Sequence, residues 1–185
     1  MATQSLPVSL GTPAPDFALR STTGAIVSLG DFAAQPVLVV AFICNHCPYV
    51  RHIESQLARV LGDYQQGGVA AVGISANDVD SYPDDDLQHL AEQATRAEFG
   101  FPYLYDETQG VARAYGAACT PDLFVFDADR RLAYRGEFDG SRPNSGVPVT
   151  GASLRAAIEH VLAGQPVPQP HRPSVGCSIK WRASG

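Results

Sequence analysis

Two cysteines separated by two residues are the part of this sequence best suited to chemistry. Cys44 and Cys47 follow an apolar run that reads Val-Leu-Val-Val-Ala-Phe-Ile, and Pro48 opens an amphipathic stretch after them. This pattern places the pair where a buried strand meets the start of a helix, and the free N–H groups and dipole of a helix start stabilise a thiolate. Because two such thiols can form and break a disulfide, the segment predicts dithiol redox chemistry.

The same cysteine spacing is also half of a four-ligand zinc site. A structural zinc site needs a second pair of ligands at comparable spacing. The chain has no second CxxC and no CxxH or HxxxH pair. We therefore expect neither a resident metal nor another cofactor, and we interpret the pair as catalytic.

Composition and charge limit the kind of protein. The 185 residues are 45% hydrophobic and 17% charged, which is typical of a globular domain. A net charge of -6 without a basic cluster argues against nucleic acid as a partner. The first residues resemble no secretory signal and no apolar run is long enough to span a membrane, so we expect a cytoplasmic protein without a membrane partner. In such a reducing compartment a CxxC is more often catalytic than structural.

Apolar runs alternate with helical patterns along the chain. Strands are expected over 25–29, 36–43, 69–74, 122–126 and 132–135, and helices over 48–64, 84–99, 109–115 and 153–162. The last two strands are expected to pair antiparallel around a turn at Asp129. This order predicts an α/β fold of three layers, with a central mixed sheet flanked by helices. We expect residues 1–163 to form the domain and the proline-rich residues 164–185 to form a tail packed on it.

An acidic run opens the second predicted helix. Asp84, Asp85 and Asp86 stand at the end of the helix where the dipole is positive. We interpret all three as helix-capping and solvated residues without a role in the site.

Several separate segments resemble a known family. The order of the elements, with a CxxC after the first central strand and a Thr-Pro before the later strand pair, resembles the thioredoxin fold. Residues 14–17 and 24–32 are similar to the amino-terminal part of the redoxin group, which contains AhpC/TSA-type peroxiredoxins and TlpA/ResA-like thiol-disulfide oxidoreductases. Five further segments resemble one TlpA-like subfamily of that group, namely 42–50, 74–78, 101–106, 119–122 and 176–181. The similarity runs from about residue 10 to the carboxyl end.

The resemblance implies roles for three residues of the Cys-Asn-His-Cys segment. Cys44, at an exposed helix start, is expected to attack a substrate disulfide or sulfenic acid as a thiolate. Cys47, one turn later and more buried, is expected to resolve the mixed disulfide. His46 is expected to stabilise the Cys44 thiolate and so make the couple more oxidising. The alternative for His46 is an exposed histidine without a partner.

Thr120 and Pro121 match the loop that carries a cis proline facing the CxxC in thioredoxin-like proteins. Such a loop holds an extended backbone edge that can pair with a substrate strand, so both residues are expected to bind substrate, and Pro121 to belong to the catalytic site. The alternative is an ordinary trans proline that opens a strand.

Two further cysteines are candidates for an accessory redox role. Cys119 would lie close to the dithiol, either as a third redox cysteine or as a small buried residue. Cys177 lies in a tail that could fold over the site. Packing of Ile179 and Trp181 against the domain is the alternative explanation for that segment.

The leading hypothesis is a thiol-disulfide oxidoreductase with antioxidant activity. Its expected partners are a protein or small-molecule disulfide and a reducing protein. Relative to ordinary thioredoxins, Ile43 replaces a tryptophan and Leu38 a buried acid, which predicts a narrower substrate range or a slower reaction.

Two alternatives remain. The first is a peroxiredoxin-like peroxidase, but the Pro-x-x-x-Thr-x-x-Cys pattern is missing, because Ala41 stands three residues before Cys44 and Cys44 itself stands three before Cys47. Arg135 is expected either to activate a peroxide or to be a solvated charge. The second alternative is a copper-binding protein of the same fold, with His160, His171 or Cys177 as a third ligand.

Overall fold

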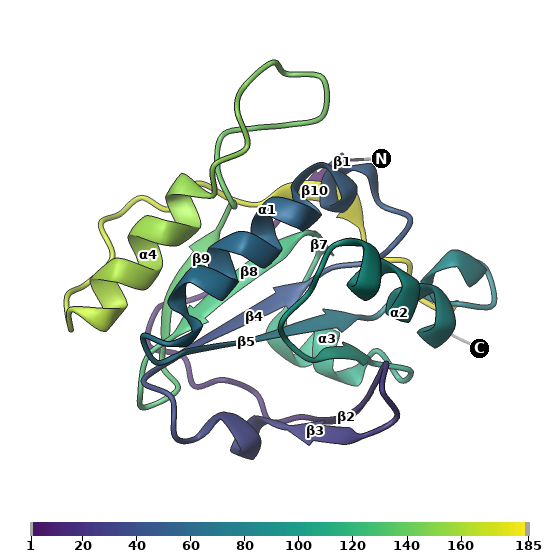
Figure 1. The fold of residues 1–185 in the computed structure, drawn as a ribbon, viewed down its shortest axis with the longest axis horizontal. Coiled ribbons are helices and arrows are strands. Elements are labelled where there is room, and N and C mark those ends of the chain that lie inside the picture. The colour runs from purple at the N-terminus through teal and green to yellow at the C-terminus, as the bar shows by residue number, and fades with distance from the viewer. Residues whose placement is uncertain (1, 184–185) are drawn as a thin grey trace.

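A seven-stranded mixed sheet forms the centre of the computed structural model, which describes residues 2–183 (Figure 1). Its strands, in the order β3-β2-β6-β5-β4-β8-β9, are β2 (Ala18–Ser21), β3 (Ile26–Ser28), β4 (Val37–Phe42), β5 (Val69–Ser75), β6 (Tyr103–Tyr105), β8 (Asp122–Phe126) and β9 (Leu132–Gly136). Strand β4 runs parallel to β5 and antiparallel to β8, and β8 and β9 form the predicted antiparallel pair. The predicted mixed sheet is confirmed.

Helices cover both faces of this sheet. They are α1 (Pro48–Gln65), α2 (Leu87–Arg96), α3 (Gly110–Tyr115) and α4 (Ala152–Leu162), with 3-10 turns at Leu29–Phe32 and Pro83–Asp85. Side chains of α1, α2 and α4 share one core cluster with Val37, Val39 and Ala41 of β4, and α3 shares a second cluster with Leu38, Val40 and Phe42. Successive residues of a strand point to opposite faces, so β4 contributes to both clusters and is buried throughout. No described helix is long and apolar enough to cross a membrane.

The second helix is shorter than the sequence predicts. Residues 83–85 form a 3-10 turn, and Asp86 caps α2 by accepting the backbone N–H of His89 at 2.9 Å. The capping interpretation is therefore confirmed for Asp86. It is wrong for Asp85, which is fully buried and belongs to the site described below.

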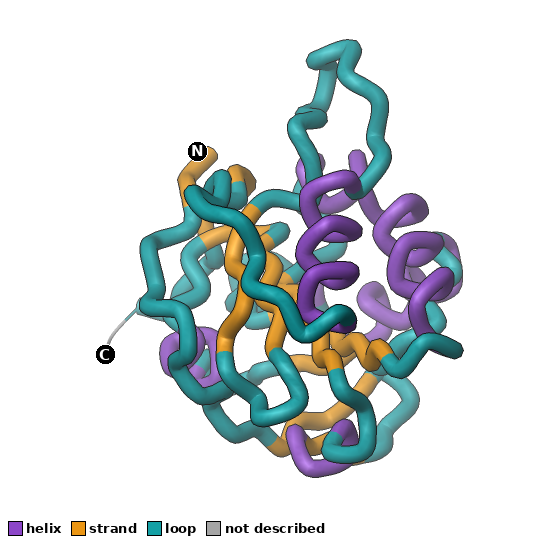
Figure 2. The backbone as a smooth tube through the Cα atoms, turned by 90° about the vertical axis from the view of Figure 1, so that its left-hand side faces the viewer, coloured by secondary structure: helices purple, strands orange, loops and turns teal. Residues whose placement is uncertain are grey.

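A second, three-stranded sheet lies beside the main one. It consists of β1 (Ala2–Gln4), β10 (Val175–Ser178) and β7 (Cys119–Thr120), with β10 in the middle and antiparallel to both neighbours. In Figure 2 its strand β1 begins at the label N, at the edge of the molecule. The sequence did not predict these strands, because they are two to four residues long and pair segments far apart in the chain. As a result, the tail reaches the Thr120-Pro121 loop.

A buried ion pair connects β8 to β9. The Arg135 guanidinium donates to the Asp122 carboxylate at 2.7 and 3.2 Å and to the carbonyls of Leu6 and Gly116. Both side chains are nearly inaccessible, at 4% and 0% exposure. The expectation of a solvated Arg135 is therefore wrong, and its donors are already committed to protein acceptors.

Replacing Arg135 by leucine should destabilise the fold strongly. Burial raises the pKa of Asp122, and the contact with Arg135 opposes that effect. Removing one partner of a buried pair leaves an uncompensated charge, so Arg135→Leu should lower the free energy of unfolding by about 3–5 kcal/mol in urea denaturation. Arg131→Leu, on the same hairpin but exposed, is the matched control and should change it by less than about 0.5 kcal/mol. Equal effects of the two variants would show that the pair does not stabilise the fold.

Candidate active site

The two cysteines lie between β4 and α1, but not as the sequence predicts. Helix α1 begins at Pro48, and Cys47 is its N-cap residue with extended backbone angles (φ -73°, ψ 121°). Proline suits the first helical position and disfavours helical geometry in the residue before it, which explains why the helix does not start at Cys44. Both thiols are fully buried, so the expectations of an exposed Cys44 at the helix start and a more buried Cys47 are wrong.

Thr120 contacts both cysteines. The Cys44 sulfur lies 3.3 Å from the Thr120 hydroxyl oxygen, and the Cys47 sulfur lies 3.2 Å from the Thr120 carbonyl oxygen, to which Cys47 donates when it is protonated. The Thr120-Pro121 peptide bond is cis, as the resemblance implied. The loop before β8 therefore faces the CxxC from across the site.

The surroundings shift the pKa values of the two thiols in opposite directions. Burial, together with the nearby Cys47 and Asp85, raises the pKa of Cys44 well above its usual value. The Cys44 thiol lowers the pKa of Cys47 to about 5, aided by Cys177 and by the Val50 amide in the first turn of α1. These effects favour the thiolate on Cys47 and the proton on Cys44, whereas the sequence analysis expects the thiolate on Cys44.

Asp85 is a site residue that the sequence analysis missed. Its Oδ1 accepts the backbone N–H groups of Asn45 (2.7 Å) and His46 (3.0 Å), and its Oδ2 accepts from Asn77 at 2.8 Å and contacts the His46 ring at 2.5 Å. The carboxylate therefore fixes the bend between the cysteines. Nothing in a run of three aspartates distinguishes the middle one, so only the three-dimensional packing identifies it.

His46 is held by Asp85 and stacks on the ring of Tyr82, with centroids 5.2 Å apart. The hydrogen bond to Asp85 raises the pKa of His46, while burial opposes the shift. A His46 nitrogen, an Asp85 oxygen and the Cys44 sulfur lie within 4.8 Å of one another. The alternative that His46 is a histidine without a partner is therefore wrong. The influence of His46 on the thiolate stays a prediction.

These three residues form a hydrogen-bonded network rather than a set of free ligands. They are the only group in residues 2–183 with metal-ligand atoms this close, and both Asp85 oxygens already accept N–H groups. His160 bonds the Ala156 carbonyl on its own helix, and His171 packs against Tyr134. Neither histidine joins the cysteines, contrary to the ligand set considered for copper.

The two accessory cysteines differ in their surroundings. Cys119 is fully buried, burial raises its pKa, and its thiol lies 3.5 Å from the Pro121 carbonyl and 3.9 Å from that of Ser174. Cys177 is partly exposed and lies directly opposite Thr120 in the β7-β10 pairing. Ile179 is buried and Trp181 lies under the Arg113 guanidinium at 4.4 Å, so both side chains contact the rest of the protein.

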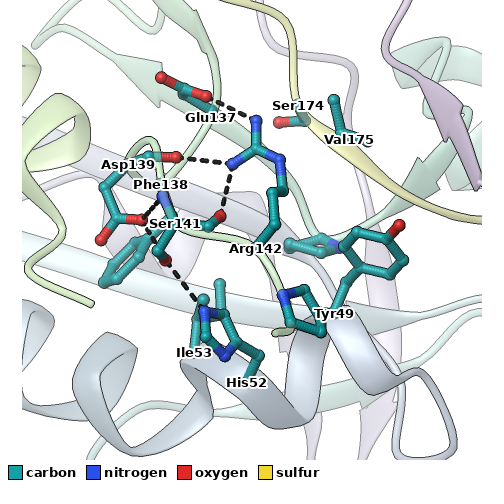
Figure 3. A pocket seen from close by; sticks show the side chains of 12 residues that line it. Tyr49, His52, Ile53, Glu137, Phe138, Asp139, Ser141, Arg142, Ser174 and Val175 are labelled. Atoms are coloured by element: carbon teal, nitrogen blue, oxygen red, sulfur yellow. Dashed lines mark hydrogen bonds and ion pairs between the residues drawn. The ribbon is translucent and has the colours of Figure 1, made fainter. Parts of the chain in front are cut away.

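A small pocket adjoins Pro121 on the side of α1 (Figure 3). Tyr49 and His52 of α1 form one wall, and the loop after β9 forms the other. Arg142 folds back on its own loop, donating to Glu137 at 2.7 Å and to the carbonyls of Asp139 and Ser141. The pocket gives an outside group a polar recess beside the predicted substrate-binding proline.

Solved structures share this fold. An uncharacterized conserved protein from Geobacillus kaustophilus is 48% identical with a TM-score of 0.97, covering 100% of this chain and 98% of that one. A hypothetical protein from Sinorhizobium meliloti 1021 is also 48% identical with a TM-score of 0.97, and the match covers 98% of this chain and 100% of that one. A putative thiol:disulfide interchange protein DsbE from Chlorobium tepidum matches at 22% identity and a TM-score of 0.68, over 84% and 99%. The molecule is thus a thioredoxin-like α/β protein, as predicted.

Sequence comparison gives the family. The AhpC/TSA family model matches residues 10–135, so the chain belongs to the AhpC/TSA family and the predicted resemblance to the redoxin group is confirmed. Peroxiredoxin 2 of Picrophilus torridus is 28% identical over 60% of this chain and 53% of its own length. The 1-Cys peroxiredoxin B of Oryza sativa subsp. japonica is 26% identical over 84% of this chain and 64% of its own length. The chain therefore spans between about half and two thirds of the length of these curated relatives.

Replacing Asp85 by asparagine should lower the pKa of His46. Because Asp85 raises that pKa in the folded protein, their contact stabilises the fold below the unfolded value of about 6.5 and is lost as pH rises through the raised value. NMR titration of the imidazole should show the fall, and the loss of stability should be greater at about pH 5 than at about pH 9. His89, which pairs with Asp86 at 2.8 Å, is an internal control that should not move. An unchanged His46 titration would contradict the pairing.

Proposed function

We propose that this protein is a thiol-disulfide oxidoreductase in which Cys44 and Cys47 form the redox pair. The observation that carries the proposal is that one threonine contacts two buried thiols, Cys44 and the helix N-cap residue Cys47. The surrounding groups favour a thiolate on Cys47 and a proton on Cys44. A thiolate beside a protonated thiol is the arrangement that two-step disulfide exchange requires. Membership of a family with peroxiredoxin relatives supports thiol redox chemistry in general.

The proposed reaction balances in two steps. The Cys47 thiolate attacks one sulfur of a substrate disulfide, a mixed disulfide forms, and the other substrate sulfur leaves as a thiolate that takes up a proton. Cys44 then loses its proton, attacks the Cys47 sulfur and releases the second substrate thiol. The substrate gains two electrons, and the Cys44–Cys47 disulfide is left for an external reductant to reduce.

His46 and Asp85 support this cycle through charge. Asp85 lies close to Cys44 and disfavours a negative charge there, which keeps the proton on Cys44 while Cys47 reacts. A protonated His46 partly offsets the aspartate charge, and its effect should be largest when Cys44 ionises in the second step. We propose His46 as a positioning and tuning residue on this basis.

The proposal includes the partners expected from the sequence. A protein or small-molecule disulfide would be the substrate, a reducing protein would return the electrons, and the cytoplasm would supply both. The polar pocket beside Pro121 supports an approach of the substrate from the side of α1. Thr120 and Pro121 would then line its path to the dithiol.

Peroxide reduction is the second candidate. The observation in its favour is that Cys47, rather than Cys44, is the helix-cap thiolate, so that Cys44 stands three residues before it, at the position of the threonine in the peroxiredoxin pattern. Against it, the Arg135 guanidinium is occupied by Asp122 and two carbonyls. A peroxidatic thiolate needs donors that stabilise the leaving oxygen, and Arg135 cannot supply them here.

Serine substitutions should separate the roles of the two cysteines. Cys47→Ser removes the attacking thiolate and should abolish reduction of hydroxyethyl disulfide. The double variant Cys44→Ser/Cys177→Ser, in which no neighbouring thiol can displace the substrate, should accumulate a mixed disulfide on Cys47, detected by mass spectrometry. Cys119→Ser, which changes a packed thiol, is the control and should react like the wild type. Wild-type exchange in Cys47→Ser would refute the proposed nucleophile.

Stopped-flow oxidation should separate the two candidate functions. Without donors aimed at the leaving oxygen, hydrogen peroxide should oxidise the reduced protein at about the rate of a free thiol of low pKa. The reduced protein should react with a small disulfide much faster. A peroxide rate that is orders of magnitude higher would favour the peroxidase.

A further inference from the structure

The carboxyl-terminal strand β10 occupies the backbone edge that was expected to receive substrate. Thr120 and Cys119 of β7 pair with Cys177 and Ser178 of β10 in antiparallel register. The approach is so close that a Cβ atom on Gly176 would lie 1.9 Å from the Thr120 carbonyl oxygen. Only glycine permits this contact, because every other residue would place a carbon there. The chain thus pairs its own strand with the loop beside the dithiol.

This pairing brings the Cys177 side chain to Cys47. Cys177 is the register partner of Thr120, whose carbonyl oxygen lies 3.2 Å from the Cys47 sulfur. Helix α1 packs against β10, and Cys177 packs against the core cluster that contains Cys44 and Cys47. The Cys177 thiol is also one of the groups that stabilise the Cys47 thiolate. A third thiol therefore faces the redox pair from the position of a bound substrate strand.

Exposure distinguishes this third thiol from the others. Cys44, Cys47 and Cys119 are each 0% exposed, whereas Cys177 is partly exposed. All four cysteines lie within the described residues and all four are free. An external thiol can reach Cys177 in this conformation, whereas any group that reacts with the buried Cys47 requires a local opening of the structure.

We propose that Cys177 is a third redox cysteine that carries the disulfide between the buried Cys44/Cys47 pair and an external thiol. The proposal rests on the function proposed above. The external partner is a small-molecule or protein thiol that acts as the reductant.

The transfer needs no oxidant beyond the disulfide already formed. The Cys177 thiolate attacks the Cys47 sulfur, the Cys44–Cys47 bond breaks, and Cys44 takes up the proton that Cys177 gave up. An external thiol then attacks the Cys177 sulfur and releases Cys47 as a thiolate. A second external thiol frees Cys177, so that the two thiols leave as one disulfide and the protein regains its three reduced cysteines.

Local charge favours the ionisation of Cys177 in the first step and the departure of Cys47 in the later one. In the reduced protein, burial and the Cys47 thiolate raise the pKa of Cys177 to about 12. Once Cys47 is part of a disulfide its charge is absent, and Lys180, which lowers the Cys177 pKa, then promotes ionisation. In the later step Cys47 leaves easily, because a thiol of low pKa is a good leaving group.

Disulfide mapping of the full chain tests the proposal. Reduced wild-type protein and its Cys44→Ser, Cys177→Ser and Cys119→Ser variants would be oxidised with one equivalent of diamide, alkylated at low pH, digested without reductant and analysed by mass spectrometry. Wild type, Cys177→Ser and the control Cys119→Ser should contain Cys44–Cys47. Cys44→Ser should contain an intramolecular Cys47–Cys177 disulfide, because Cys47 has lost its usual partner Cys44 and Cys177 is the nearest remaining thiol that we propose as redox-active.

The outcomes distinguish this proposal from the one on which it rests. A wild-type Cys44–Cys47 disulfide together with an alkylated Cys177 in Cys44→Ser would overturn the role of Cys177 and leave the proposed function intact. Absence of Cys44–Cys47 from the wild type and from Cys177→Ser would overturn the proposed function itself.

Reduction kinetics separate disulfide transfer from simple covering of the site. Glutathione should reduce oxidised Cys177→Ser about tenfold more slowly than wild type, since serine preserves the strand but removes the sulfur. If β10 only covers the site, Cys177→Ser will match the wild type, which contradicts the proposal. In Gly176→Ala, where the strand must move away from Thr120, Cys47 should be alkylated faster than in the wild type.

Discussion

The contacts of Thr120 are the constraint on which the rest of the site depends. Its hydroxyl meets Cys44, its carbonyl meets Cys47, and its backbone pairs with Cys177. This position follows from the sheet, because Phe42 at the end of β4 lies opposite Asp122 at the start of β8. The residues before β8 must therefore meet the residues after β4, and those residues include both cysteines.

Electrostatic effects then give the two thiols different protonation states and therefore different roles. The hydrogen bond from Cys44 and the start of α1 favour an anion on Cys47, whereas burial and the nearby Asp85 disfavour one on Cys44. The same carboxylate binds the backbone of Asn45 and His46 and so fixes the bend that carries the pair. A single buried aspartate thus fixes the geometry of the site and adds to the effect of burial that keeps the proton on Cys44.

Local sequence patterns predicted the long elements and the place of the chemistry. The apolar run of β4, the three- and four-residue periodicity of α1 and the CxxC between them are signals within one short window. The Thr-Pro loop was predicted through family resemblance, because its partner lies over seventy residues away. Asp85, the pairing of β10 and the thiolate on Cys47 were not predicted. Each depends on contacts between distant segments or on where the helix begins, which residue spacing does not determine.

The central claim is that the reduced site holds one thiolate, on Cys47, with the proton kept on Cys44. The most direct measurement is the ultraviolet absorbance of thiolate against pH in the full-length reduced protein. The structure predicts that one thiolate per chain ionises with a pKa of about 5 and that Cys47→Ala abolishes this transition while Cys177→Ser retains it. A first ionisation near the ordinary thiol value of about 8.5, or a low transition that survives in Cys47→Ala, would contradict the account.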